Sequence, residues 1–292
     1  MPTKLTSPNG EIIIGYEFPT VLINDQLRIM DQEPIIFEQL AALNLTGVLE
    51  IAKNGFQCGM DIVDILVFHP ELNEIELLPR IAHLINEKIG CPISLDSRNP
   101  EALEAALKEL QPYSAMINSV TANKESLEII LPLVKKYNAV VVGMPIGDTY
   151  GLPKNVQERI FEANVIIQAC ADMGIPKDRI VMDGVCLASS AEPDSFRVTM
   201  QSLKAFHEKL KVATTLGIGN AGYGMPIPTV IDLAYLVAAI PWGLDSALVN
   251  PATSGLVETV RAIDFLDGSD SSGRRYIKWY RKNKKNKNLF EG

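Results

Sequence analysis

The chain has 292 residues, of which 47% are hydrophobic, and a formal net charge of −8. This length and composition allow one large globular core, and the negative charge argues against nucleic acid as a partner. The first residues lack the basic and apolar segments of a secretion signal, and no apolar run is long enough for a membrane span. The four cysteines are widely spaced and form no CxxC motif, as is typical of free thiols in a reducing compartment. We therefore expect a cytoplasmic protein that makes no membrane contact.

Short apolar segments alternate with helical patterns along most of the chain. The expected strands are residues 11–15, 61–68, 92–95, 115–117, 139–143, 180–182, 212–216 and 246–249. Helical patterns at 35–43 and 47–54 follow the first of them, and one at 255–265 follows the last. Such alternation is typical of parallel strands that are buried on both faces. We predict an α/β fold, a (β/α)8 TIM barrel that forms a single domain over residues 1–292, with a doubly wound open sheet as the alternative.

Polar side chains stand directly after most of these strands. They are Asp96, Asn118, Asp183, Asn220 and Asn250, with Ser97 beside Asp96 and Glu17 just beyond the first strand as further candidates. Each residue alone is as expected for a cap or a turn. The C-terminal ends of parallel strands lie on one face, however, so we expect these groups to converge at one mouth.

The chemistry of this set favours a flat, nitrogen-rich ring. A carboxylate can accept a pair of N–H bonds from an aminopyrimidinone edge, and an amide can both donate and accept. A phosphate ligand is disfavoured, because Arg98 is the cation nearest to these motifs in the sequence. The histidines are scattered, so no nucleophilic triad is indicated. The pattern therefore predicts binding of a heterocycle such as a pterin.

A glycine-rich segment follows the seventh expected strand. Gly217, Gly219 and Gly222 fit the G-x-G-x-x-G nucleotide-binding pattern literally, but that pattern needs its third glycine in the first turn of a helix. Pro226 and Pro228 delay the helix, so we disfavour the nucleotide interpretation.

Basic residues are concentrated in a tail from about residue 270 to the C-terminus. A solvated terminal helix is the simpler interpretation of this tail, and a docking arm for an acidic partner protein is the alternative.

Several segments around these polar residues resemble the pterin-binding, dihydropteroate synthase-like barrel family. Within that family the chain is most similar to the methyltetrahydrofolate:corrinoid protein methyltransferases. The similar segments are residues 93–97, 115–119, 182–183, 220–226 and 243–251.

The resemblance implies an enzyme that moves a methyl group between N5 of tetrahydrofolate and the cobalt of a partner corrinoid protein. It implies that Asp96, Asn118 and Asp183 hold the pterin ring, and that Asn220 lies near N5 as the catalytic residue. Tetrahydrofolate or 5-methyltetrahydrofolate would be the substrate, cobalamin would be carried by the partner, and this chain would bind no metal. Members of the family typically form homodimers.

The chain departs from the family pattern at three places. Residues 15–17 read Gly-Tyr-Glu where the family has Gly-Glu-Arg-Ile-Asn, Leu66 replaces an amide, and Ile227-Pro228 replaces Asn-Arg. Two alternatives therefore stay open. One is a dihydropteroate synthase-type enzyme, in which Lys211 would bind the diphosphate of the substrate. The other is a folate- or corrinoid-binding protein without catalytic activity.

Overall fold

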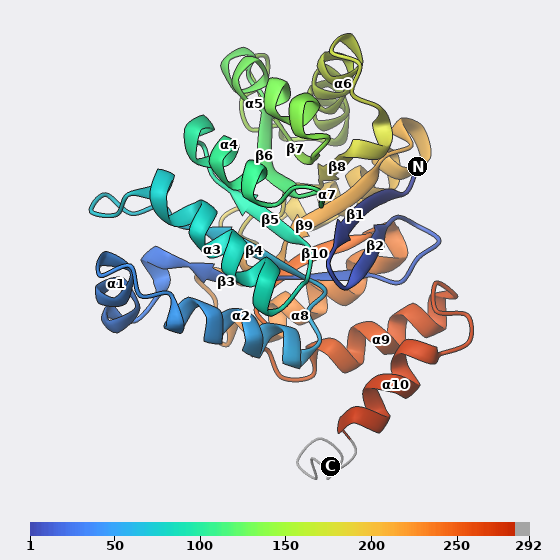
Figure 1. Cartoon of the computed structure of the whole chain (residues 1–292). Coiled ribbons are helices and arrows are strands. Elements are labelled where there is room, and N and C mark those ends of the chain that lie inside the picture. Colours follow the sequence, from blue (N-terminus) through green and yellow to red (C-terminus); the bar gives the residue numbers. More distant parts are fainter. Residues whose placement is uncertain (284–292) are drawn as a thin grey trace.

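The computed structural model describes residues 1–283 and shows a closed barrel of parallel strands inside a ring of helices (Figure 1). The barrel strands are β3 (Val21–Arg28), β4 (Ile62–Leu66), β5 (Ile93–Asp96), β6 (Met116–Ala122), β7 (Val140–Gly147), β8 (Ile180–Asp183), β9 (Ala213–Gly217) and β10 (Ser246–Val249). Each strand pairs with the next in the sequence, and β10 pairs with β3 to close the barrel. The predicted (β/α)8 fold is confirmed.

Helices cover the outside of the barrel, and all but the last two of them connect successive strands. They are α1 (Pro34–Ala41), α2 (Thr46–Cys58), α3 (Glu74–Lys88), α4 (Pro100–Glu109), α5 (Lys124–Tyr137), α6 (Val156–Asp172), α7 (Ser195–Ala205), α8 (Pro228–Ala239), α9 (Leu256–Asp267) and α10 (Arg274–Asn283). Their apolar stripes face inward, as in α3, where Leu78, Ile81 and Ile85 are fully buried at helical spacing. None of the helices in residues 1–283 has both the length and the apolar character that crossing a bilayer requires.

The first expected strand does not enter the barrel. It is β2 (Gly10–Ile14), which pairs antiparallel with β1 (Thr3–Ser7) to form a hairpin. Leu5 and Ile14 are fully buried against barrel residues, and the Thr3 hydroxyl donates to the carbonyl of Ile180, the first residue of β8. The hairpin therefore closes the N-terminal end of the barrel. The true first strand, β3, was missed by the sequence analysis.

The described part of the basic tail is packed against the molecule. Arg275 of α10 donates to both carboxylate oxygens of Asp61 at 2.9 and 3.1 Å, and Lys282 donates to the carbonyl of Gln57 at 2.9 Å. The basic residues from position 284 onward lie outside the described residues.

Candidate functional site

Three neighbouring strands bring polar groups together at the C-terminal end of the barrel. Asp96 is the last residue of β5 and is the register partner of Asn118 in β6. The Asn118 amide donates to the carboxylate of Asp64, in β4, over 3.3 Å between Nδ2 and Oδ1. Asn99 caps α4 by accepting from the backbone N–H of Glu101, which fixes the chain directly after β5. Asp64, Asp96 and Asn118 thus form one acid-amide cluster.

The acid-amide cluster retains protons near neutral pH. Burial raises the pKa of Asp64 to about 7, and the nearby Asp96 carboxylate adds to the rise. Burial likewise raises the pKa of Asp96 to about 6, although the charges of Arg28 and Arg98 oppose the change. At pH 7 the cluster can therefore both accept N–H donors and donate a proton to an acceptor.

Asp183 and Asn220 follow two further strands of the same barrel. Asp183 ends β8, is half-buried, and accepts the backbone N–H of Val185 at 2.7 Å. Burial raises the pKa of Asp183 to about 6. Asn220 ends the 3₁₀ turn Ile218–Asn220 after β9, is exposed, and has no side-chain hydrogen bond with any residue of 1–283. Asp183 is the register partner of Thr215 in β9, so the two strand ends are adjacent.

Two acidic residues of this face were not predicted from the sequence as site candidates. Asp64 is one of them, and Asp25 in β3 is the other. Burial raises the pKa of Asp25, and the charge of Arg28 opposes the rise. A Cβ atom built on Gly219 would lie 4.0 Å from the Asp25 carboxylate, which places Asp25 beside the Asn220 turn. The sequence did offer one signal for Asp25, because polar residues directly follow the apolar run Val21–Ile23.

Of the three further candidates, two stabilise the turns in which they lie, and the third lies at the opposite end of the barrel. The Ser97 hydroxyl accepts the N–H of Asn99 at 3.0 Å, and the Asn250 amide oxygen accepts that of Ala252 at 2.8 Å, so both side chains stabilise turns. Glu17 lies between β2 and β3, at the N-terminal end of the barrel. The structure separates Glu17 from the other candidates because β2 belongs to the hairpin.

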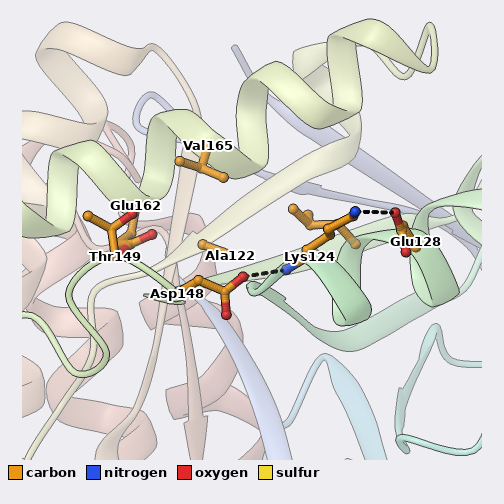
Figure 2. Close-up of a pocket in the computed structure, with 8 residues that line it drawn as sticks. Ala122, Lys124, Glu128, Asp148, Thr149, Glu162 and Val165 are labelled. Atoms are coloured by element: carbon orange, nitrogen blue, oxygen red, sulfur yellow. Dashed lines mark hydrogen bonds and ion pairs between the residues drawn. The ribbon is translucent and has the colours of Figure 1, made fainter.

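A cavity of about 350 Å³ lies apart from these residues, between α5 and α6 (Figure 2). Leu127 and Val165 contribute apolar walls, and Lys124 pairs with Glu128 at its edge over 3.7 Å. Glu162 of α6 also lines it and accepts the backbone N–H of Tyr150 at 2.9 Å, which holds the loop after β7. This cavity contains none of the predicted site residues.

Comparison with known proteins gives one family and several distant relatives. Residues 35–250 match the family described as pterin binding enzyme. A methylcorrinoid:tetrahydrofolate methyltransferase of Eubacterium limosum is 23% identical over 256 residues, which cover 86% of this chain and 93% of the relative. A methionine synthase of Mycobacterium leprae is 26% identical over 274 residues, but these cover 84% of this chain and only 22% of that protein.

The fold is also similar to solved structures. A dihydropteroate synthase from Coxiella burnetii in complex with pteroic acid superposes with a TM-score of 0.68, at 17% identity over 91% of this chain and 98% of that chain. At this identity the likeness shows the barrel fold alone.

Proposed function

The chain belongs to the family of pterin binding enzymes, and on this premise we propose that it moves a methyl group between N5 of tetrahydrofolate and the cobalt of a partner corrinoid protein. Similarity to a methylcorrinoid:tetrahydrofolate methyltransferase over 86% of the chain supports a pterin-binding methyltransferase. The choice of reaction and partner is the part that we propose.

The acid-amide cluster is the observation that carries this proposal. The Asp96 and Asn118 pair, with Asp64 hydrogen-bonded to the amide, presents carboxylate and amide groups at the barrel end where TIM-barrel enzymes hold their substrates. A carboxylate there can accept two N–H bonds from the aminopyrimidinone edge of a pterin, and Asn118 can bond its ring carbonyl. Asp183, on the far side of β7, would bond a further ring N–H.

Asn220 is the proposed catalytic residue because its amide carries no competing hydrogen bond within residues 1–283. In the folate-to-cobalt direction, the carbon–nitrogen bond at N5 breaks and its electron pair stays on N5, while Co(I) supplies the pair for the new cobalt–carbon bond. A hydrogen bond from the Asn220 amide N–H to N5 makes this nitrogen a better leaving group and stabilises the charge that changes there. The remaining task of the protein is to align the methyl group with the cobalt.

The surface beside Asn220 supports a protein partner. Tyr223 is 74% exposed, Met225 41% and Ile227 70%, all in the loop between β9 and α8. Adjacent exposed apolar side chains mark interaction sites. We propose that the corrinoid protein docks over this loop, and that two copies of the chain form a homodimer.

A transfer assay tests the function directly. The protein is mixed with 5-methyltetrahydrofolate labelled on the methyl group and with cobalamin reduced to Co(I), which stands in for the unidentified corrinoid protein. We expect labelled methylcobalamin to form. Tight folate binding without transfer, also after addition of corrinoid proteins from the source organism, would instead favour a binding protein without catalytic activity.

Variants separate binding from turnover. We expect Asp96→Ala and Asn118→Ala to weaken folate binding by about tenfold or more, since each removes a bond to the ring. Asn220→Ala should lower turnover about 10- to 100-fold at saturating folate while it changes the dissociation constant little. Glu17→Ala, at the other end of the barrel, is the control. Equal losses of binding and turnover in Asn220→Ala would remove its catalytic role.

The dihydropteroate synthase alternative predicts that the protein condenses a pterin diphosphate with p-aminobenzoate. The same protein preparation can be assayed for this condensation. Lys211, the lysine that this alternative needs, precedes β9 and so lies at the N-terminal end of the barrel. It is therefore badly placed to bind a diphosphate at the mouth.

A further inference from the structure

The turn that follows Asp183 has an unusual backbone. Val185 has a φ of 60°, in the left-handed region that a β-branched side chain rarely adopts. Such a conformation persists only where the surroundings impose it. The hydrogen bond from the Val185 N–H to the Asp183 carboxylate depends on this turn. What holds the turn therefore also holds Asp183.

Two buried side chains hold this turn from beneath. Arg159 of α6 donates from Nη1 to the carbonyl of Gly184, and Thr199 of α7 donates to the carbonyl of Val185 at 2.9 Å. The same guanidinium nitrogen donates to the Thr199 hydroxyl at 3.0 Å, so the two supports are linked. The carbonyl groups of residues 184 and 185 thus both accept hydrogen bonds from side chains of the helices beneath the turn.

Arg159 also brings a buried positive charge. Its residue is 1% exposed, and its Nε has no hydrogen-bond partner within residues 1–283. The titratable groups that face it are Asp183, Cys186 on the same turn and Tyr235 of α8. Since a buried arginine is normally paired with an acid, the nearby Asp183 is the anion that its charge can stabilise.

We propose that Arg159, together with Thr199, is a positioning residue that fixes the turn after β8 and thereby holds the Asp183 carboxylate toward the N–H donors of a bound pterin. Arg159 does not touch the substrate. The inference rests on the proposed function, because it assigns the reason why Asp183 can bind the ring.

A double-mutant cycle on folate affinity tests the proposal. The variants are Arg159→Met, Asp183→Asn and the two combined, measured from pH 5 to pH 8 by calorimetry with tetrahydrofolate. Arg159→Met alone should weaken binding about tenfold at pH 7 and shift the pH at which affinity rises to a higher value. In the Asp183→Asn background the same change should have no further effect.

Control variants separate position from charge. Arg159→Lys retains the charge and should preserve the pH profile better than Arg159→Met, whereas Thr199→Val should weaken binding without shifting that profile. Arg197→Met, on the exposed face of α7, should change nothing. Thermal melts identify variants that do not fold, and Thr199→Val with Asp183→Asn then forms the replacement cycle.

The outcomes are distinguishable. If the wild-type protein binds no folate, the proposed function fails and this inference with it. If the wild type binds folate but Arg159→Met weakens binding equally in both backgrounds, Arg159 has only a general structural role and the inference alone is overturned.

Discussion

Asp64 combines deep burial with a neighbouring acid. The residue is 2% exposed, and the folded chain raises its pKa from 3.8 to about 7. The folded state therefore binds this proton more tightly than the unfolded chain does. The stabilisation that comes from this tighter proton binding is fully present below the pKa of Asp64 in the unfolded chain and is lost as the pH rises through its pKa in the folded chain. The protein without ligand therefore loses stability between about pH 4 and pH 7.

The Asp64→Asn variant tests this linkage. We expect the free energy of unfolding of the variant, relative to that of the wild type, to be about 2 kcal/mol higher at pH 8 than at pH 5, because the buried charge no longer forms. Urea denaturation at both pH values measures it. Asp148→Asn is the pH-independent control: bonds from the Lys124 N–H and Asn123 lower the pKa of Asp148, so this carboxylate is ionised in the folded and the unfolded chain at both pH values, and the difference from the wild type should be the same at pH 5 and pH 8. A pH-independent difference for Asp64→Asn would contradict the argument.

At the scale of elements, the packing of α2 on β3 sets the position of Asp25. Asn24 is fully buried, and its amide oxygen accepts the N–H of Gln26 at 3.0 Å. Gly55 of α2 allows the helix to approach this side chain, because a Cβ there would lie 2.8 Å from Cγ of Asn24 and closer still to its Nδ2. Asn24 cannot move away without disturbing β3.

We therefore expect Gly55→Ala to destabilise the protein by about 1–3 kcal/mol, even though alanine favours a helix more than glycine does. Urea denaturation provides the measurement, and Asn54→Ala on the exposed side of the same helix is the control. The variant should also bind folate more weakly if Asp25 contributes to the site. Unchanged or increased stability would show that β3 tolerates displacement.

The strands that the sequence predicted and the one it missed differ in pattern. From β4 onward each strand begins with an apolar run, so seven barrel strands were located, but β6 and β7 extend to Ala122 and Gly147, past the predicted ends at 117 and 143. Asn118, predicted to follow a strand, therefore lies within β6. In β3 the run Val21–Ile23 continues into Asn24, Asp25 and Gln26, which resembled a loop. The preceding segment, 11–14, has the stronger strand pattern but pairs locally with residues 3–7, and alternation alone does not distinguish these pairings.

The same distinction applies to the candidate site. Residues that directly follow a strand could be identified, because parallel topology places all strand ends on one face. Asp64 lies within the apolar run of β4, and Arg159 lies in a helix that supports another loop. Their roles depend on contacts between distant segments, which no local pattern encodes.

At the scale of the whole molecule, the first and last parts of the barrel are joined by one ionic network. The Asp61 carboxylate, just before β4, accepts the Leu22 N–H at 3.0 Å and pairs with Arg275 at 2.9 Å and with Arg261 of α9 at 3.4 Å. Arg261 and Arg275 also donate to the carbonyl of Thr20. Closure of the barrel therefore depends on a half-buried carboxylate that serves both arginines.

Removing this charge should weaken closure more than removing a surface pair. We expect Asp61→Asn to lower the free energy of unfolding by about 3 kcal/mol, since it leaves Arg275 without its carboxylate partner and leaves the buried Arg261 with Asp264 alone, at 3.6 Å. Glu128→Gln, which removes the exposed partner of Lys124, should cost less than about 1 kcal/mol. Both are measured by urea denaturation at low and high salt, and only the surface pair should respond strongly to salt. If Asp61→Asn costs no more than Glu128→Gln, then the hydrogen bonds of the two arginines to Thr20 suffice, and closure rests on strand pairing and apolar packing instead.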